Sequence, residues 1–148
     1  MNDLKLSAFD AEDLQIISTH MQDAVLRVGD MKFLPGRKRF ALVANRFNWQ
    51  HAQSEGKEFR RRRTGLHFDR VSSARAQRIR QNAPNAVLEL LSITFRESEA
   101  PSGTVVLSFA DGATVELDVE CIDCGLADLG PEWGTRSLPE HDIDEINA

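Results

Sequence analysis

Two cysteines in the C-terminal third of the sequence have the spacing of a metal or redox motif. Cys121 and Cys124 form a C-x-x-C pair, and a thiol oxidoreductase places such a pair at a helix N-terminus, where the helix dipole lowers the thiol pKa. Here the pair follows an alternating β pattern, and the charge of Asp123 raises the thiol pKa. Zinc would need two further ligands at suitable spacing, and the four histidines are scattered singly. We therefore predict no metal site and no cofactor, with Cys121 as a core residue.

Two histidines have the chemistry for acid–base catalysis. His51 and His67 flank a basic stretch that contains Glu55 and Glu58, and a folded-back loop would bring an acid and a base together. Catalysis needs rigid placement, whereas residues 50–63 are polar and read as a loop. The sequence also has no tyrosine and none of the glycine-rich motifs for phosphate binding or a serine nucleophile. These observations argue against an enzyme, and we assign no catalytic residue.

Charge is distributed unevenly along the chain. Residues 1–26 hold one lysine against five acids, residues 27–80 hold 15 Lys and Arg against four acids, and residues 81–148 hold two arginines against 14 acids. The net charge of −5 therefore conceals a basic middle segment. A folded chain of this length has a radius of gyration of roughly 15 Å, so its opposite faces lie several Debye lengths of about 8 Å apart. A basic face can then act independently of an acidic one.

The run FRRRRTGLHF, from Phe59 to Phe68, is the densest part of the basic segment. Four adjacent positive charges repel one another, so we expect these arginines to lie extended and exposed to water. Solvation alone would account for such a run, and binding is the sharper hypothesis. The candidate binding residues are Phe59, Arg60, Arg61, Arg62, Arg63 and Arg70.

Contacts with proteins are the function that the sequence favours. The chain would be a non-enzymatic interaction module that binds a protein partner or forms a homodimer. In a two-fold homodimer, the arginines of one subunit would pair with acids of the other. Those acids are Glu116, Asp118 and Glu120 on one strand face, together with the acidic tail that begins at Glu132.

Two alternatives use the same basic segment. The first is an RNA- or DNA-binding accessory domain that uses residues 57–80, in which aromatic side chains would stack on bases. We assign most of these aromatic residues to the core instead, because Phe47 and Trp49 share a strand face with Val43, and the RNA-recognition signature is missing. The second is a phospholipid head-group site in a pleckstrin-like barrel, whose long C-terminal helix has no counterpart in the sequence.

The pattern of apolar residues predicts one helix and about eight short strands. Asp10 can cap a helix over residues 11–21, whose apolar face is Leu14, Ile17 and Met21. The expected strands span residues 4–9, 25–28, 31–34, 39–49, 66–79 with an interruption near Ser72, 86–95, 104–109 and 113–121. Asp111-Gly112 predicts a tight hairpin turn with positive φ.

These elements predict an α+β fold that is mainly antiparallel β: a single barrel- or sandwich-like domain with one N-terminal helix. We expect residues 1–130 to form the β-rich domain and residues 131–148 to form an extended acidic tail. The apolar runs are too short to span a bilayer, and residues 1–9 lack the pattern of a signal peptide. With two cysteines too close for a disulfide framework, the sequence predicts a reduced, cytoplasmic protein.

Five stretches of the sequence stand out as motifs: DAEDL from Asp10, QDAVLRVGDMKFLP from Gln22, RFALVANRFNW from Arg39, GLHFDRV from Gly65 and DLGPEWGTRSLPEH from Asp128. In these stretches the chain resembles a family of small alphaproteobacterial proteins of unknown function. The resemblance covers nearly the whole chain. It implies a single bacterial cytosolic domain and transfers no catalytic residue.

Overall fold

The structure is a computed structural model that describes residues 3–47, 60–130 and 133–134. Within these ranges the one α-helix, α1, spans Ala11–Met21, as predicted. The side chain of Asp10 accepts a hydrogen bond of 2.8 Å from the backbone N–H of Asp13, which satisfies one of the free amides of the first turn. The helix buries the predicted face, made of Leu14, Ile17 and Met21. No helix in the described ranges is long and apolar enough to cross a membrane.

Strands form most of the remaining described chain. They are β1 (Lys5–Ala8), β2 (Val25–Arg27), β3 (Met31–Leu34), β4 (Arg39–Phe47), β5 (Arg60–Asp69), β6 (Val71–Gln77), β7 (Val87–Glu97), β8 (Gly103–Phe109), β9 (Thr114–Val119), β10 (Cys124–Asp128) and β11 (Trp133–Gly134). Short 3₁₀ turns, η1 (Val28–Asp30), η2 (Pro35–Arg37) and η3 (Ala110–Gly112), connect some of them.

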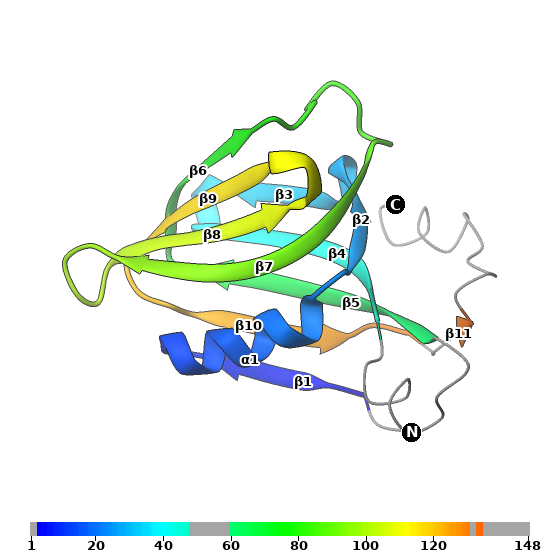
Figure 1. Ribbon diagram of the computed structural model, residues 1–148. Coiled ribbons are helices and arrows are strands. Elements are labelled where there is room, and N and C mark those ends of the chain that lie inside the picture. The colour runs from blue at the N-terminus through cyan, green and yellow to red at the C-terminus, as the bar shows by residue number, and fades with distance from the viewer. Residues whose placement is uncertain (1–2, 48–59, 131–132, 135–148) are drawn as a thin grey trace.

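The strands form one antiparallel sheet in the order β1-β10-β5-β4-β2-β7-β8-β9-β6, with β3 paired to β4 and β11 paired to β5. The short strand β2 joins the two halves, because its Val25 pairs with Asn45 of β4 and with Glu89 of β7. Figure 1 shows the sheet bent so that β6 to β9 lie over β4, β5 and β10, while α1 lies between β7 and β1. The sheet does not close into a barrel, since β1 and β6 remain at its ends. The fold is therefore the predicted single, mainly antiparallel β domain, in an open form.

The space inside the bend is the hydrophobic core. In β9 the predicted alternation is confirmed, because Val115, Leu117 and Val119 are buried while the residues between them are not. Its partner β8 alternates in the same way. The turn between them contains the predicted positive φ angles, 65° at Asp111 and 79° at Gly112.

Three sequence predictions about local structure are wrong. The strand expected from residue 66 begins at Arg60, so the arginine run belongs to a paired strand. An additional strand, β10, begins at the second cysteine of the C-x-x-C motif and places Cys124 in the core, while Cys121 is only half-buried. In β4 the buried face holds Phe40, Leu42 and Ala44, and Val43 and Phe47 lie half-buried on the opposite face. Trp49 lies outside the described residues.

Candidate functional site

The arginines of β5 belong to the sheet because β4 pairs with this part of β5. In this pairing Arg61 lies opposite Phe47 and Arg62 lies opposite Arg46. Since side chains alternate between faces along a strand, neighbouring arginines point to opposite faces. The guanidinium of Arg61 lies 4.6 Å from the centroid of the Phe47 ring and donates a 3.1 Å hydrogen bond to the carbonyl of Asn45. The side chain of Arg62 points inward and is only 1% exposed.

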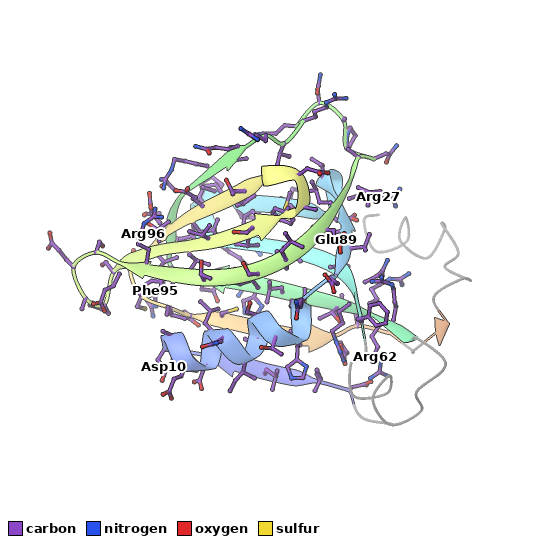
Figure 2. The ribbon with its side chains drawn as sticks, in the orientation of Figure 1. Asp10, Arg27, Arg62, Glu89, Phe95 and Arg96 are labelled. Atoms are coloured by element: carbon purple, nitrogen blue, oxygen red, sulfur yellow. The ribbon has the colours of Figure 1, made fainter. Side chains whose placement is uncertain are left out.

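A buried ionic cluster holds Arg62 in place. Its centre is Asp128, at the end of β10, whose side chain is fully buried. Arg46 donates to both Asp128 oxygens, at 3.0 and 2.9 Å, and the hydroxyl of Thr64 donates at 2.8 Å. Arg62 approaches the same carboxylate at 3.3 Å. Figure 2 shows Arg62 at the opposite end of α1 from Asp10.

The cluster also fixes the N-terminal strand and explains the ionisation of Asp128. The backbone N–H of Leu4 donates a 2.7 Å hydrogen bond to Asp128, and Asp3 lies 2.8 Å from Arg62. Burial by itself would raise the pKa of Asp128, but hydrogen bonds from Arg46, Leu4 and Thr64 outweigh burial, so the pKa lies below its ordinary value. The pKa of nearby His20 is lowered, by burial first and by the charge of Arg46 second. These charges serve the fold, since together they join β1, β4, β5 and β10.

The expectation that the arginine run is exposed is therefore wrong for Arg62, and Arg61 is half-buried. The physical reason is that a carboxylate 66 residues away provides a buried partner, which charge repulsion along the run cannot reveal. Arg70 follows the far end of β5, about 30 Å from Arg61 at roughly 3.3 Å per residue. The structure thus does not bring the candidate binding residues together. Phe59 and the side chain of Arg60 lie outside the described residues.

The acidic strand face that was expected to pair with a second subunit is already paired within the chain. Arg75 of β6 lies opposite Glu116 of β9. It lies 3.1 Å from Glu116 and makes a short ion pair with Asp118. The hydrogen bond from Arg75 is the largest of several effects that hold the pKa of Asp118 well below its ordinary range. At the end of the same face, Lys38 lies 2.7 Å from Glu120.

The burial of Cys124 makes the cysteine pair poorly suited to metal binding or redox chemistry. Cys124 is 2% exposed, and burial, followed by the charges of Asp123 and Asp69, raises the pKa of its thiol strongly. Within the described ranges, no group of three His, Cys, Asp or Glu side chains comes close enough to hold a metal ion. His51, Glu55 and Glu58, considered above for acid–base chemistry, fall outside those ranges.

A groove of about 410 Å³ lies where the sheet stays open, between β3 and β6. We call it the edge groove. Its walls are Met31, Lys32 and Phe33 of β3 on one side and Ala74, Arg75 and Ala76 of β6 on the other. Phe40, Val115, Ile79 and Pro84 are among the other lining residues. Met31, Phe33, Ala74 and Ile79 are half-buried against the core, so the floor of the groove is apolar and partly open to solvent.

Backbone hydrogen bonds define both ends of the edge groove. At one end the N–H of Val71 donates to the carbonyl of Lys38, at 2.9 Å. At the other end the N–H groups of Val28 and Gly29 donate to the carbonyls of Ala86 and Pro84, at 2.9 and 2.8 Å. Between these ends, in the described chain, β3 pairs only with β4 and β6 pairs only with β9. Each strand therefore presents one edge of backbone N–H and C=O groups to the groove.

In two other hollows polar side chains already bind other parts of the chain. The one between α1 and β7 has a volume of about 490 Å³, and its Ser18 hydroxyl already accepts a 2.9 Å hydrogen bond from the backbone of Ile93. The one around Arg70 is lined by charged side chains, but its charges are balanced: Arg70 lies 3.6 Å from Asp123, and Lys38 pairs with Glu120 as described. The edge groove is the stronger candidate site.

Sequence reasoning missed the edge groove because it depends on which strand edges remain unpaired. A local signal did exist: MKFL in β3 and ARAQRIR around β6 both interleave small or apolar residues with cations. That pattern is common on exposed strands. It gives no indication that two such strands, about 40 residues apart, face each other.

Comparison with known proteins places the chain in a family without assigning it an activity. No curated protein and no solved structure matches the chain. A family model described as a protein of unknown function, DUF2948, matches residues 4–141, nearly the whole chain. The chain belongs to the DUF2948 family.

Proposed function

We propose that the protein is a non-enzymatic interaction module that binds an extended segment of a partner protein in the edge groove. The observation that carries this proposal is the position of an apolar groove between two strand edges that are unpaired in the described chain. A segment in β conformation would use these edges for backbone hydrogen bonds and the groove for its side chains, which is how several peptide-recognition domains bind. The volume of the edge groove falls within the usual range of ligand pockets, roughly 300 to 1,000 Å³.

The contacts of the arginine run support this proposal over the alternatives. Arg61 and Arg62 make hydrogen bonds and ion pairs inside the chain, so they have little capacity left for phosphate groups. Glu116 and Asp118 are occupied by Arg75, so the strand face that a homodimer through the arginine run would use has fewer acids available. The edge groove, by contrast, offers apolar surface and backbone groups that no described residue covers.

Selection of peptides on a groove-blocked variant tests the proposal. Random seven-residue peptides, the length of β6, would be displayed on phage and selected on the wild type. Ala76→Trp fills the groove from β6, and Ser72→Trp places the same side chain on an exposed position of that strand outside the groove lining. We expect the selected peptides to bind the wild type and Ser72→Trp but not Ala76→Trp. Peptides that bind all three proteins equally, or a selection that enriches none, would contradict the proposal.

A further inference from the structure

The inference concerns the chemistry of the segment that the edge groove accepts, and it rests on the proposed function. We infer that this segment is acidic and alternates apolar with carboxylate side chains. The apolar part follows from the floor, where Met31, Phe33 and Ile79 are half-buried. In an extended segment every second side chain would face this floor, and the remaining side chains would face the rim.

The rim of the edge groove is positively charged. Lys32 lines the β3 wall, and Arg80 lies in the sequence between the lining residues Ile79 and Gln81. Arg78 precedes Ile79, and its guanidinium lies beside Gly112 of the turn between β8 and β9. All three are exposed, and none has an ion pair with any residue that the structure describes. Flexible cationic side chains of this kind can lay their apolar stems along a bound segment and direct their charges to its carboxylates.

The walls contain almost no negative charge to balance these cations. Residues 27–38 include one acid, Asp30, and residues 70–86 include none. The carboxylate of Asp30 already accepts a 3.2 Å hydrogen bond from the backbone of Arg27. The largest charge on this rim therefore comes from the three unpaired cations, which attract a segment of opposite charge.

The other open edge of the sheet has the opposite character. Strand β1 ends the sheet on that side. The acids Asp10 and Glu12 stand close to it in the sequence, against the single cation Lys5, while Asp3 is paired with Arg62. An acidic segment would be repelled there. A second copy of the chain that paired groove to groove would bring like charges together at Lys32, Arg78 and Arg80, which is unfavourable. These contrasts point to an acidic segment of a partner protein rather than to a second copy.

Three seven-residue peptides with blocked ends test the inference by calorimetry. Each alternates valine or isoleucine with a second residue type: aspartate and glutamate, asparagine and glutamine, or lysine. We expect the acidic peptide to bind about tenfold more tightly than the neutral one, on the basis of about three rim ion pairs, and to weaken as salt is added. The lysine peptide should bind more weakly than the neutral one.

Charge variants localise the effect and separate the two proposals. The triple variant Lys32→Gln, Arg78→Gln, Arg80→Gln should lose the preference for the acidic peptide but keep its affinity for the neutral one, and Lys5→Gln should behave like the wild type. Equal binding of acidic and neutral peptides would overturn the acidic chemistry and leave the groove as a binding site. Binding of none of the peptides would overturn both. A dimer that Ala76→Trp abolishes would assign the groove to a second copy and overturn the inference.

Discussion

Arg46 and Asp128 are 82 residues apart in the sequence and form a two-pronged ion pair in the core, with Nε–Oδ1 and Nη2–Oδ2 distances of 3.0 and 2.9 Å. Their side chains are 3% and 0% exposed. Because Arg62 also approaches Asp128, this carboxylate stands between two buried guanidinium groups. Its loss would remove the carboxylate partner of Arg46 and the buried one of the two carboxylates that Arg62 approaches, in a medium of low dielectric constant.

Asp128→Asn should therefore destabilise the protein by about 3–5 kcal/mol. Urea denaturation followed by circular dichroism measures this change as a shift of the unfolding midpoint. Asp123→Asn is the matched control, since among the described residues Asp123 forms an ion pair only with the exposed Arg70. This substitution should cost less than about 1 kcal/mol. If the two variants lost similar amounts, the buried cluster would not have the role assigned to it.

The same carboxylate predicts a loss of stability in acid. The folded-state pKa of Asp128 lies below its ordinary value of 3.8, so the group contributes stability above about pH 4 and loses it as pH falls through the folded pKa. The free-energy difference between the wild type and Asp128→Asn should thus shrink between about pH 5 and pH 2. Denaturation midpoints at several pH values measure this difference. A difference that stays constant over that range would show that Asp128 has no lowered pKa.

The sequence predicts correctly the elements that depend on local contacts, and it fails for those that depend on distant partners. The helix over 11–21 and the Asp111-Gly112 turn depend on neighbours a few residues away, and both were predicted correctly. The burial of Arg62 depends on Asp128, and the β10 strand depends on its pairing with β1 and β5. Neither partner can be inferred from the local pattern, since four arginines in a row resemble a solvated loop whether or not a distant carboxylate is present.

Local reasoning failed in the same way for the candidate site. The edge groove requires β3 and β6 to face each other without pairing, which is a property of the strand order. The sequence did indicate that this segment is basic, and Lys32, Arg78 and Arg80 belong to it. It could not distinguish these unpaired cations from Arg75, which is paired with acids of β9.

The hairpin turn between β8 and β9 makes Gly112 sensitive to substitution. Its φ of 79° lies in the left-handed region, which a β-branched residue resists. Gly112→Val should cost about 1–3 kcal/mol and lower the melting temperature by several degrees, at roughly 2–8 °C per kcal/mol. Gly36→Val is the control, because Gly36 has no positive φ and, apart from its chain neighbours, no atom of the described residues lies within 4 Å of its added Cβ. Melting of Gly112→Val within about a degree of wild type would show that the turn is described wrongly.

The two cysteines should differ in reactivity toward a thiol reagent. Cys121 is half-buried, whereas Cys124 is 2% exposed with a raised thiol pKa, and the thiolate is the reactive form. In native protein, Ellman's reagent should modify Cys121 first and Cys124 only after denaturation. The variant Cys121→Ser should then show no rapid reaction. A rapid reaction in that variant would mean that Cys124 is accessible and outside the core.

Amide hydrogen exchange with and without the acidic peptide tests the central claim most directly, because it reports on the backbone edges themselves. In the free protein, amides of β3 and β6 that face the edge groove should exchange faster than those that pair with β4 and β9. Addition of the peptide should slow exchange at these groove-facing amides, within residues 31–34 and 71–77, and leave β1, the other open edge, unchanged. Protection confined to β1 or to the arginine strand β5, or no protection at all, would contradict the account.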